Sequence, residues 1–149
     1  MSYQVDNGIM ENFFRQDGRL NRWRYFKRFM ILNFVAIMIL LIGLFFLNDP
    51  ASDDFTIIQK IYIDFITLLE LIPQFCLMKR RLHDMDDDET IAVLMVSLHI
   101  FNFANNHLDL VNDDIIFALG VIYFFCTIYI LFGKGTIGKN KYGTDPLEK

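Results

Sequence analysis

The sequence predicts an all-α integral membrane protein with four transmembrane helices and both termini in the cytoplasm. Three observations support this prediction: four apolar segments of about the length of a membrane helix, Lys and Arg residues confined to alternate connecting segments, and acidic residues in the others. The helices are expected at residues 29–47, 57–78, 91–107 and 115–132.

The composition limits the class of protein further. The chain has 149 residues, room for one domain, and 54% of them are hydrophobic, more than the roughly 45–50% usual in soluble domains. This composition excludes disordered, collagen-like and disulfide-scaffold proteins. The net charge of -4 also lacks the basic excess that contacts with nucleic-acid phosphates require, so no nucleic-acid partner is expected.

The first and fourth apolar segments carry the strongest signal. Residues 29–47 contain no charged side chain, and Asn33 is their one strongly polar residue. At about 1.5 Å per residue, a helix of this length spans ~28 Å, close to the thickness of a bilayer's hydrocarbon core. Residues 115–132 form a second uncharged segment. A soluble core helix would show a polar face, and neither segment has one.

The second and third segments are less apolar. Residues 57–78 include Lys60, Asp64, Glu70 and Pro73, and residues 91–107 reach membrane length only by including three asparagines. An acid at a helix centre costs about 2.5–3.5 kcal/mol, whereas each Leu, Ile or Phe contributes about 0.3–0.6 kcal/mol. Because two acids about cancel the ten such residues between positions 61 and 78, we expect this helix to insert with help from its neighbours.

The placement of charge predicts the topology. Thirteen of the fourteen Lys and Arg residues precede residue 29, lie within 79–90, or follow residue 132, and Lys60 is the exception. The segments 48–56 and 104–114 carry only acidic charges. Lys and Arg are retained on the cytoplasmic side, so both termini are expected in the cytoplasm and the chain is expected to cross the membrane four times.

This topology divides the chain into three parts. Residues 1–28 form a cytoplasmic segment in which arginines and aromatic residues lie at the membrane interface, residues 29–132 the membrane domain, and residues 133–149 a cytoplasmic tail rich in Gly, Asn and Tyr. No cleaved signal peptide is apparent. Cys76 and Cys126 fall within apolar segments and are expected to be small buried hydrophobic residues.

Three short motifs flank the expected helices. Residues 18–22 read GRLNR, residues 80–84 read RRLHD, and a G-x-x-G-x-N-x-Y-G-x-D-P pattern begins at Gly135. In this order, over residues 13–146, the motifs resemble domain-of-unknown-function family 805, the small bacterial inner-membrane proteins of the YhaH/YhaI-like type. The resemblance implies a multi-pass inner-membrane protein with no established activity. The chain departs from the family at residues 85–89, where MDDDE replaces the usual small, basic and Trp residues.

All three motifs fall on the predicted cytoplasmic side. Arg80 and Arg81 directly follow a helix, where guanidinium groups meet lipid phosphates. His83 and Asp84 could bond back to these arginines or cap the next helix. One interpretation is a topology anchor with a structural salt bridge, and the other is a site for lipid or a partner protein. The candidate contact residues are Arg19, Arg22, Arg80, Arg81, His83, Asp84, Asn140 and Tyr142.

Polar side chains also form a stripe along the second expected helix. At 100° per residue they lie within an arc of about 120°, and acyl chains cannot satisfy them, so they must face protein or a hydrated cavity. Asp64 can pair with Lys60, four residues away. We expect Glu70, near mid-membrane, to be hydrogen-bonded across the bundle. The stripe comprises Lys60, Asp64, Thr67, Glu70, Gln74 and Arg81, and the expected partners of Glu70 are Asn33, Ser97, His99 or Thr127.

Two functions are consistent with these features. The motifs favour a non-enzymatic module that binds membrane lipids, a membrane-protein partner or a second copy of the chain through its cytoplasmic face. The alternative is a small transporter or channel subunit that uses the polar stripe, chiefly Asp64, Glu70 and Gln74. A G-x-x-x-x-G-K match at residues 133–139 is rejected because Asn140 stands where a phosphate-binding loop has Ser or Thr. We expect no catalytic residues, cofactor or metal.

Overall fold

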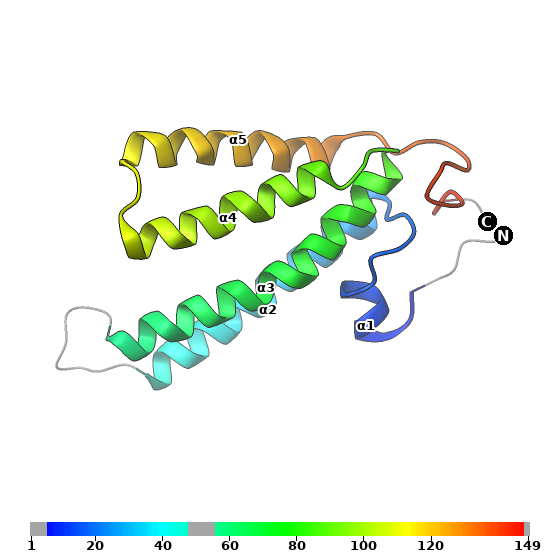
Figure 1. Ribbon diagram of the computed structural model, residues 1–149. Coiled ribbons are helices and arrows are strands. Elements are labelled where there is room, and N and C mark those ends of the chain that lie inside the picture. Colours follow the sequence, from blue (N-terminus) through cyan, green and yellow to red (C-terminus); the bar gives the residue numbers. More distant parts are fainter. Residues whose placement is uncertain (1–5, 48–55, 148–149) are drawn as a thin grey trace.

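The computed structural model describes residues 6–47 and 56–147, and this part of the chain is helical with no β-strand (Figure 1). The helices are α1 (Gly8–Phe13), α2 (Arg22–Phe46), α3 (Ile57–Asp84), α4 (Thr90–Leu108) and α5 (Asp113–Phe132). Helices α2 to α5 are each long and apolar enough to cross a membrane. The prediction of an all-α protein with four membrane-length helices is therefore confirmed.

Two of the long helices extend beyond the apolar segments that predict them. Helix α2 begins at Arg22, where the Asn21 side chain accepts a hydrogen bond from the Arg24 backbone N–H at 2.9 Å. Helix α3 continues through Pro73 to Asp84. A charged residue ends a membrane span without ending a helix, because Arg and Lys are good helix formers in water. The expected boundaries at residues 29 and 78 therefore mark the limits of the uncharged or apolar segments and not the ends of the helices.

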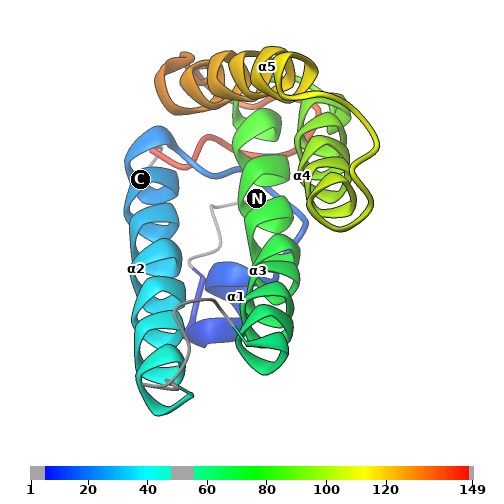
Figure 2. The same cartoon turned by 90° about the vertical axis from the view of Figure 1, so that its left-hand side faces the viewer.

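The long helices form two hairpins, α2–α3 and α4–α5, which lie closest together at one end (Figures 1 and 2). We call this end, which carries the start of α2, the end of α3 and residues 133–147, the basic end, and the opposite one the far end. Towards the far end the hairpins separate, as Figure 1 shows. Helix α1 packs against α3 near the basic end.

The buried core also lies at the basic end. It consists of Leu20, Tyr25, Leu77, Met78, Leu82, Ala92, Met95 and Ile130. Elsewhere large apolar side chains point outward, with Phe45 of α2 77% exposed and Phe124 of α5 59% exposed. Lipid tails solvate such side chains as well as protein does, so outward-facing apolar residues are what a membrane-spanning helix needs.

Candidate functional site

The three sequence motifs come together at the basic end. The first precedes α2, the second is the last turn of α3, and the third is the tail after α5. Residues 18–22 bond to the end of α3 through the Leu20 backbone N–H, which donates to the Arg80 carbonyl at 3.0 Å. The tail bonds to the same place through the Thr136 backbone N–H, which donates to the Asp84 carbonyl at 2.8 Å. We call residues 18–22, 80–84 and 133–146 the motif cluster.

Asp84 is the centre of the motif cluster. One carboxylate oxygen accepts from Nε of Arg19 at 3.2 Å, and the other accepts from Nη1 of Arg81 at 2.7 Å. Arg81 also donates from Nε to the Ile130 carbonyl at 3.1 Å and from Nη2 to the Gly133 carbonyl. Its side chain is fully buried. One guanidinium group therefore links the end of α3 to the end of α5.

Arg19 links the segment before α2 to the tail. Its Nη1 donates to the Gly138 carbonyl and its Nη2 to the Thr136 carbonyl, both at 2.5 Å. The residue is 2% exposed, and burying a guanidinium group is tolerated only when its donors are satisfied in this way. Backbone carbonyl oxygens, which no sequence pattern displays, are thus three of the four hydrogen-bond acceptors of Arg19.

Arg80 faces the opposite direction and holds the N-terminal segment. Its Nη2 contacts both carboxylate oxygens of Asp6, at 3.0 and 2.8 Å, and its Nη1 donates to the Glu11 carbonyl at 3.1 Å. Arg28 and Arg15 also pair with Asp6. Burial alone would raise the pKa of Asp6, but the hydrogen bonds and charges of Arg80 and Arg28 hold it below its ordinary value.

The tail folds over His83. The Tyr142 ring stacks on the imidazole with centroids 3.7 Å apart and planes 7° apart, and the Asn140 side-chain amide donates to the His83 carbonyl at 2.8 Å. A turn at residues 140–143 is closed by backbone bonds and ends at Gly143, whose φ of 136° favours glycine. At Gly135 a Cβ atom would lie 2.3 Å from the Asp84 carboxylate, so the close approach of the tail requires glycine there.

The structure thus brings the eight candidate contact residues to one end of the molecule but places them differently. Arg19, Arg80, Arg81, His83 and Asp84 are buried, Asn140 and Tyr142 are half-buried, and Arg22 is exposed. The expected salt bridge within the RRLHD motif is present between Arg81 and Asp84. The Nη atoms of Arg80 and all three nitrogens of Arg81 donate to internal acceptors, and the two side chains are 2% and 0% exposed. Nε of Arg80 is buried without a hydrogen-bond partner in the described residues. Contact with lipid phosphates therefore stays a prediction for Arg22.

Beside Arg22 the tail leaves a shallow pocket of about 410 Å³, which we call the tail pocket. Arg22 and Lys134, both exposed, border it, and their side-chain charges have no ion-pair or hydrogen-bond partner within residues 6–47 and 56–147. Trp23, 62% exposed, stands at its edge with the Lys27 ammonium 5.1 Å from its ring. The lining is Asn21, Arg22, Trp23, Asp84, Gly133, Lys134, Gly135, Thr136, Ile137, Asp145 and Leu147.

The polar stripe of α3 has different partners from those expected. Asp64 pairs with His107 of α4, with 3.0 Å between Oδ2 and Nε2, and the ion pairs of the described residues include none with Lys60. His107 reaches Asp64 because the far ends of α3 and α4 face each other, which spacing within one helix does not reveal. Glu70 Oε1 is buried and accepts no hydrogen bond from the described chain. Asn33 and Thr127, two of its expected partners, donate instead to carbonyls of their own helices.

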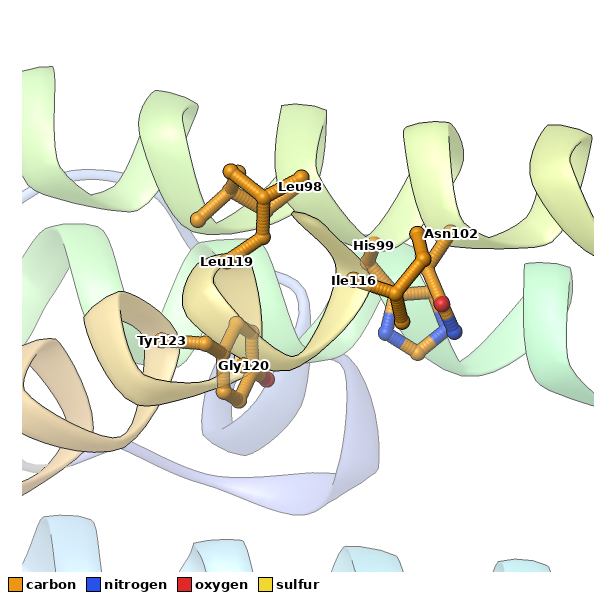
Figure 3. A pocket seen from close by; sticks show the side chains of 7 residues that line it. All are labelled: Leu98, His99, Asn102, Ile116, Leu119, Gly120 and Tyr123. Carbon is orange, nitrogen blue, oxygen red and sulfur yellow. The ribbon is translucent and has the colours of Figure 1, made fainter. Parts of the chain in front are cut away.

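A second pocket lies between α4 and α5. Its volume is about 330 Å³, and it is lined by Leu98, His99, Asn102, Ile116, Leu119, Gly120 and Tyr123. Figure 3 shows His99 and Asn102 close together on α4, with Tyr123 and Gly120 on α5 at the other end of the same space. We call it the α4–α5 pocket. The residue pattern of a single helix does not predict this pocket, because the pocket arises from the distance between two helices.

These features define a four-helix membrane protein whose hairpins are joined at one end by a buried arginine–aspartate cluster. Within the described residues no group of three or more His, Cys, Asp or Glu side chains is arranged to hold a metal ion. The chain matches the family described as "Protein of unknown function (DUF805)" over residues 13–144, and it belongs to that family. Comparisons with the curated proteins and with the solved structures gave no match.

Proposed function

We propose that the protein is a non-enzymatic module of the bacterial inner membrane, with both termini in the cytoplasm, that binds the headgroup of an anionic lipid in the tail pocket. The observation that carries this proposal is the pair of exposed cations, Arg22 and Lys134, at the border of one pocket. A lipid phosphate has the charge and the acceptor oxygens that a guanidinium and an ammonium group bind.

The other charges around the tail pocket leave it basic. Asp84 is already paired with Arg19 and Arg81. Asp145 accepts hydrogen bonds from the backbone N–H groups of Leu147 and Gly138, which hold the pKa of its carboxyl group below the ordinary value. It stays ionised, and its single negative charge is outweighed by the two cations Arg22 and Lys134. The start of α2 adds the partial positive charge of a helix N-terminus.

The depth of the tail pocket also suits a headgroup. Trp23 lies in the first turn of a membrane-length helix, where tryptophan is enriched in membrane proteins. Ile137, on the opposite side of the pocket, is 97% exposed. Entry of so exposed an apolar side chain into the acyl region beside the headgroup lowers the free energy of the complex.

The test is lipid retention by the double variant Arg22→Gln/Lys134→Gln, measured by native mass spectrometry in mild detergent. Each cation near a membrane surface contributes about 1 kcal/mol, so removing two weakens phosphatidylglycerol binding by roughly 30-fold. The matched control is Lys139→Gln/Lys141→Gln, which removes the same charge from the tail outside the pocket. Equal loss of lipid in both variants, or in neither, contradicts the proposal, and retention of a protein instead of lipid would indicate a partner-binding role.

The proposed orientation has its own test. With both termini in the cytoplasm, single cysteines at Gln16, Met85 and Thr144 are protected from an impermeant thiol reagent added to intact cells, whereas one at Asn106 is labelled. Labelling of Met85 from outside would contradict the four-crossing topology with the basic end inside.

A second candidate function, a path for protons or a small solute, is favoured by one observation: the buried Oε1 of Glu70 has no hydrogen-bond partner in the described chain. An unpaired acidic group at the middle of a membrane helix is a functional hypothesis by default. Glu70→Gln keeps the shape and removes the ionisation. If Glu70 carries protons, the variant accumulates normally but shows no proton flux into liposomes. If the proton flux of the parent protein never exceeds that of empty liposomes, this candidate function is wrong.

A further inference from the structure

The α4–α5 pocket contains polar side chains that no protein group satisfies. His99, Asn102 and Tyr123 all line it, and within residues 6–47 and 56–147 none of their side chains has a hydrogen-bond partner. On α3, which contacts both α4 and α5, the buried Oε1 of Glu70 is unpaired as well. Four hydrogen-bonding groups from three helices are thus left over in one region of the bundle.

The depth of these groups makes their lack of partners significant. His99, Tyr123 and Glu70 each lie at the middle of a membrane-length helix, at α4, α5 and α3 respectively. No bulk water reaches the centre of a bilayer, and an unsatisfied polar group there is strongly unfavourable. His99 and Tyr123 are half-buried and Asn102 is exposed, so an occupant that supplies hydrogen-bond donors and acceptors can reach all three and satisfy them.

The lining of the pocket identifies the chemistry of that occupant. Leu98, Ile116 and Leu119 form apolar walls, and the lining includes no Lys or Arg that would hold a phosphate or carboxylate. About 330 Å³ is at the small end of ligand-binding pockets, enough for a compact polar head whose apolar body stays in the surrounding lipid.

We propose that the α4–α5 pocket binds an uncharged, membrane-soluble molecule whose head carries carbonyl or hydroxyl groups, held by His99, Asn102 and Tyr123. Two kinds of membrane molecule share this chemistry: quinones, through their ring carbonyls, and diacylglycerols, through their ester carbonyls and free hydroxyl. The proposal is independent of the tail pocket, which takes a charged headgroup at the basic end.

Gly120 offers a way to fill the pocket without disturbing the fold. It lines the pocket, and a Cβ atom added there would meet no atom within 4 Å. Its φ is negative, as in any helical residue, so a larger side chain brings no backbone strain. Leucine is a far better helix former than glycine, so Gly120→Leu occupies the space while favouring α5.

The test measures the thermal stability of the purified full-length protein in detergent with two probes, a short-chain alkyl benzoquinone and dioctanoylglycerol. At least one probe raises the unfolding temperature of the parent in a saturable manner. The probe that does so shows whether the bound molecule is of the quinone or the diacylglycerol kind. Gly120→Leu abolishes this shift, whereas Ala118→Leu, which places the same side chain at an exposed α5 position outside the pocket, retains it. Tyr123→Phe, which removes one hydroxyl group, weakens binding about fivefold.

Three results would overturn the proposal. The first is that neither probe stabilises the parent. The second is that Gly120→Leu binds the probe as the parent does, with circular dichroism showing both to be folded. The third is a parent dimer in native mass spectrometry that Gly120→Leu dissociates, because a second copy of the chain would then be the occupant.

Discussion

Replacing Arg81 by Lys separates two roles that the same charge can have. If Arg81 only marks the cytoplasmic side of a membrane helix, Lys serves equally well, because both residues carry one positive charge. In the structure Arg81 donates in three directions: to Asp84, to the Ile130 carbonyl and to the Gly133 carbonyl. A lysine ammonium group sits at one point and cannot reproduce the planar spread of a guanidinium group.

The expected loss of stability follows from these contacts. Lysine can keep the ion pair with Asp84, and it leaves the two carbonyl oxygens without the donor that Arg81 supplies. A hydrogen bond from a charged group contributes about 1.5–3 kcal/mol. Because the remaining ammonium group relaxes towards one carbonyl, we expect Arg81→Lys to lower the free energy of unfolding by about 3 kcal/mol.

The assay is unfolding by increasing sodium dodecyl sulfate in mixed micelles, followed by circular dichroism. Arg22→Lys is the matched control, because Arg22 undergoes the same chemical change on an exposed side chain and its effect should stay within about 0.5 kcal/mol. If Arg81→Lys unfolds together with Arg22→Lys, the three internal hydrogen bonds do not stabilise the protein and the topology-anchor interpretation is correct.

Three further changes test other parts of the basic end. The arginine partners of Asp6 hold its pKa below the ordinary 3.8, against the effect of burial. Its ion pairs therefore stabilise the fold above that pH and are lost as the pH falls through the pKa of the folded state. A dye attached to α1 should become mobile only below about pH 3.8 in the parent, but already at pH 7 in Asp6→Asn. Gly135→Ala would set a Cβ 2.3 Å from a carboxylate oxygen of Asp84 and should lower the unfolding temperature, and a temperature unchanged from the parent would contradict this packing. Tyr142→Phe should keep the stack on His83 and Tyr142→Ala should lose about 1 kcal/mol of tail docking, seen as faster proteolysis of residues 133–147 in the Ala variant alone.

The fold could be predicted from the sequence because long uncharged segments leave few alternatives. For residues 57–78 the free-energy cost of inserting two acids about equals the gain from the apolar residues, so hydropathy alone does not decide whether they cross the membrane. The alternating positive charges favour a crossing, which agrees with the length of α3. Helix ends were predicted less well. Hydropathy reports where lipid begins, whereas Asn21 and Thr56 begin α2 and α3 by accepting hydrogen bonds from the first free backbone N–H groups.

The site could be predicted only in part, and for a physical reason. The motifs name the donors of the cluster, Arg19, Arg80 and Arg81, but most of their acceptors are backbone carbonyls of the tail and of α5. A carbonyl group belongs to every residue and leaves no mark in the sequence. Asp6 lies 74 positions from Arg80, outside every motif, so only the folded chain shows that the N-terminal segment supplies the second buried carboxylate.

The positions of the polar groups show where the two hairpins are held together. Apolar side chains in a bilayer gain little by leaving lipid for protein, so polar contacts and close packing must hold the hairpins together. Arg81 ties α3 to the end of α5, and Arg19 ties the start of α2 to the tail. Both lie at the basic end, and towards the far end the ion pair of Asp64 with His107 joins α3 to α4. Between these two connections the middle of the membrane holds the unpaired groups of the α4–α5 pocket, so a ligand bound there would supply the polar contacts that the chain itself leaves unmade.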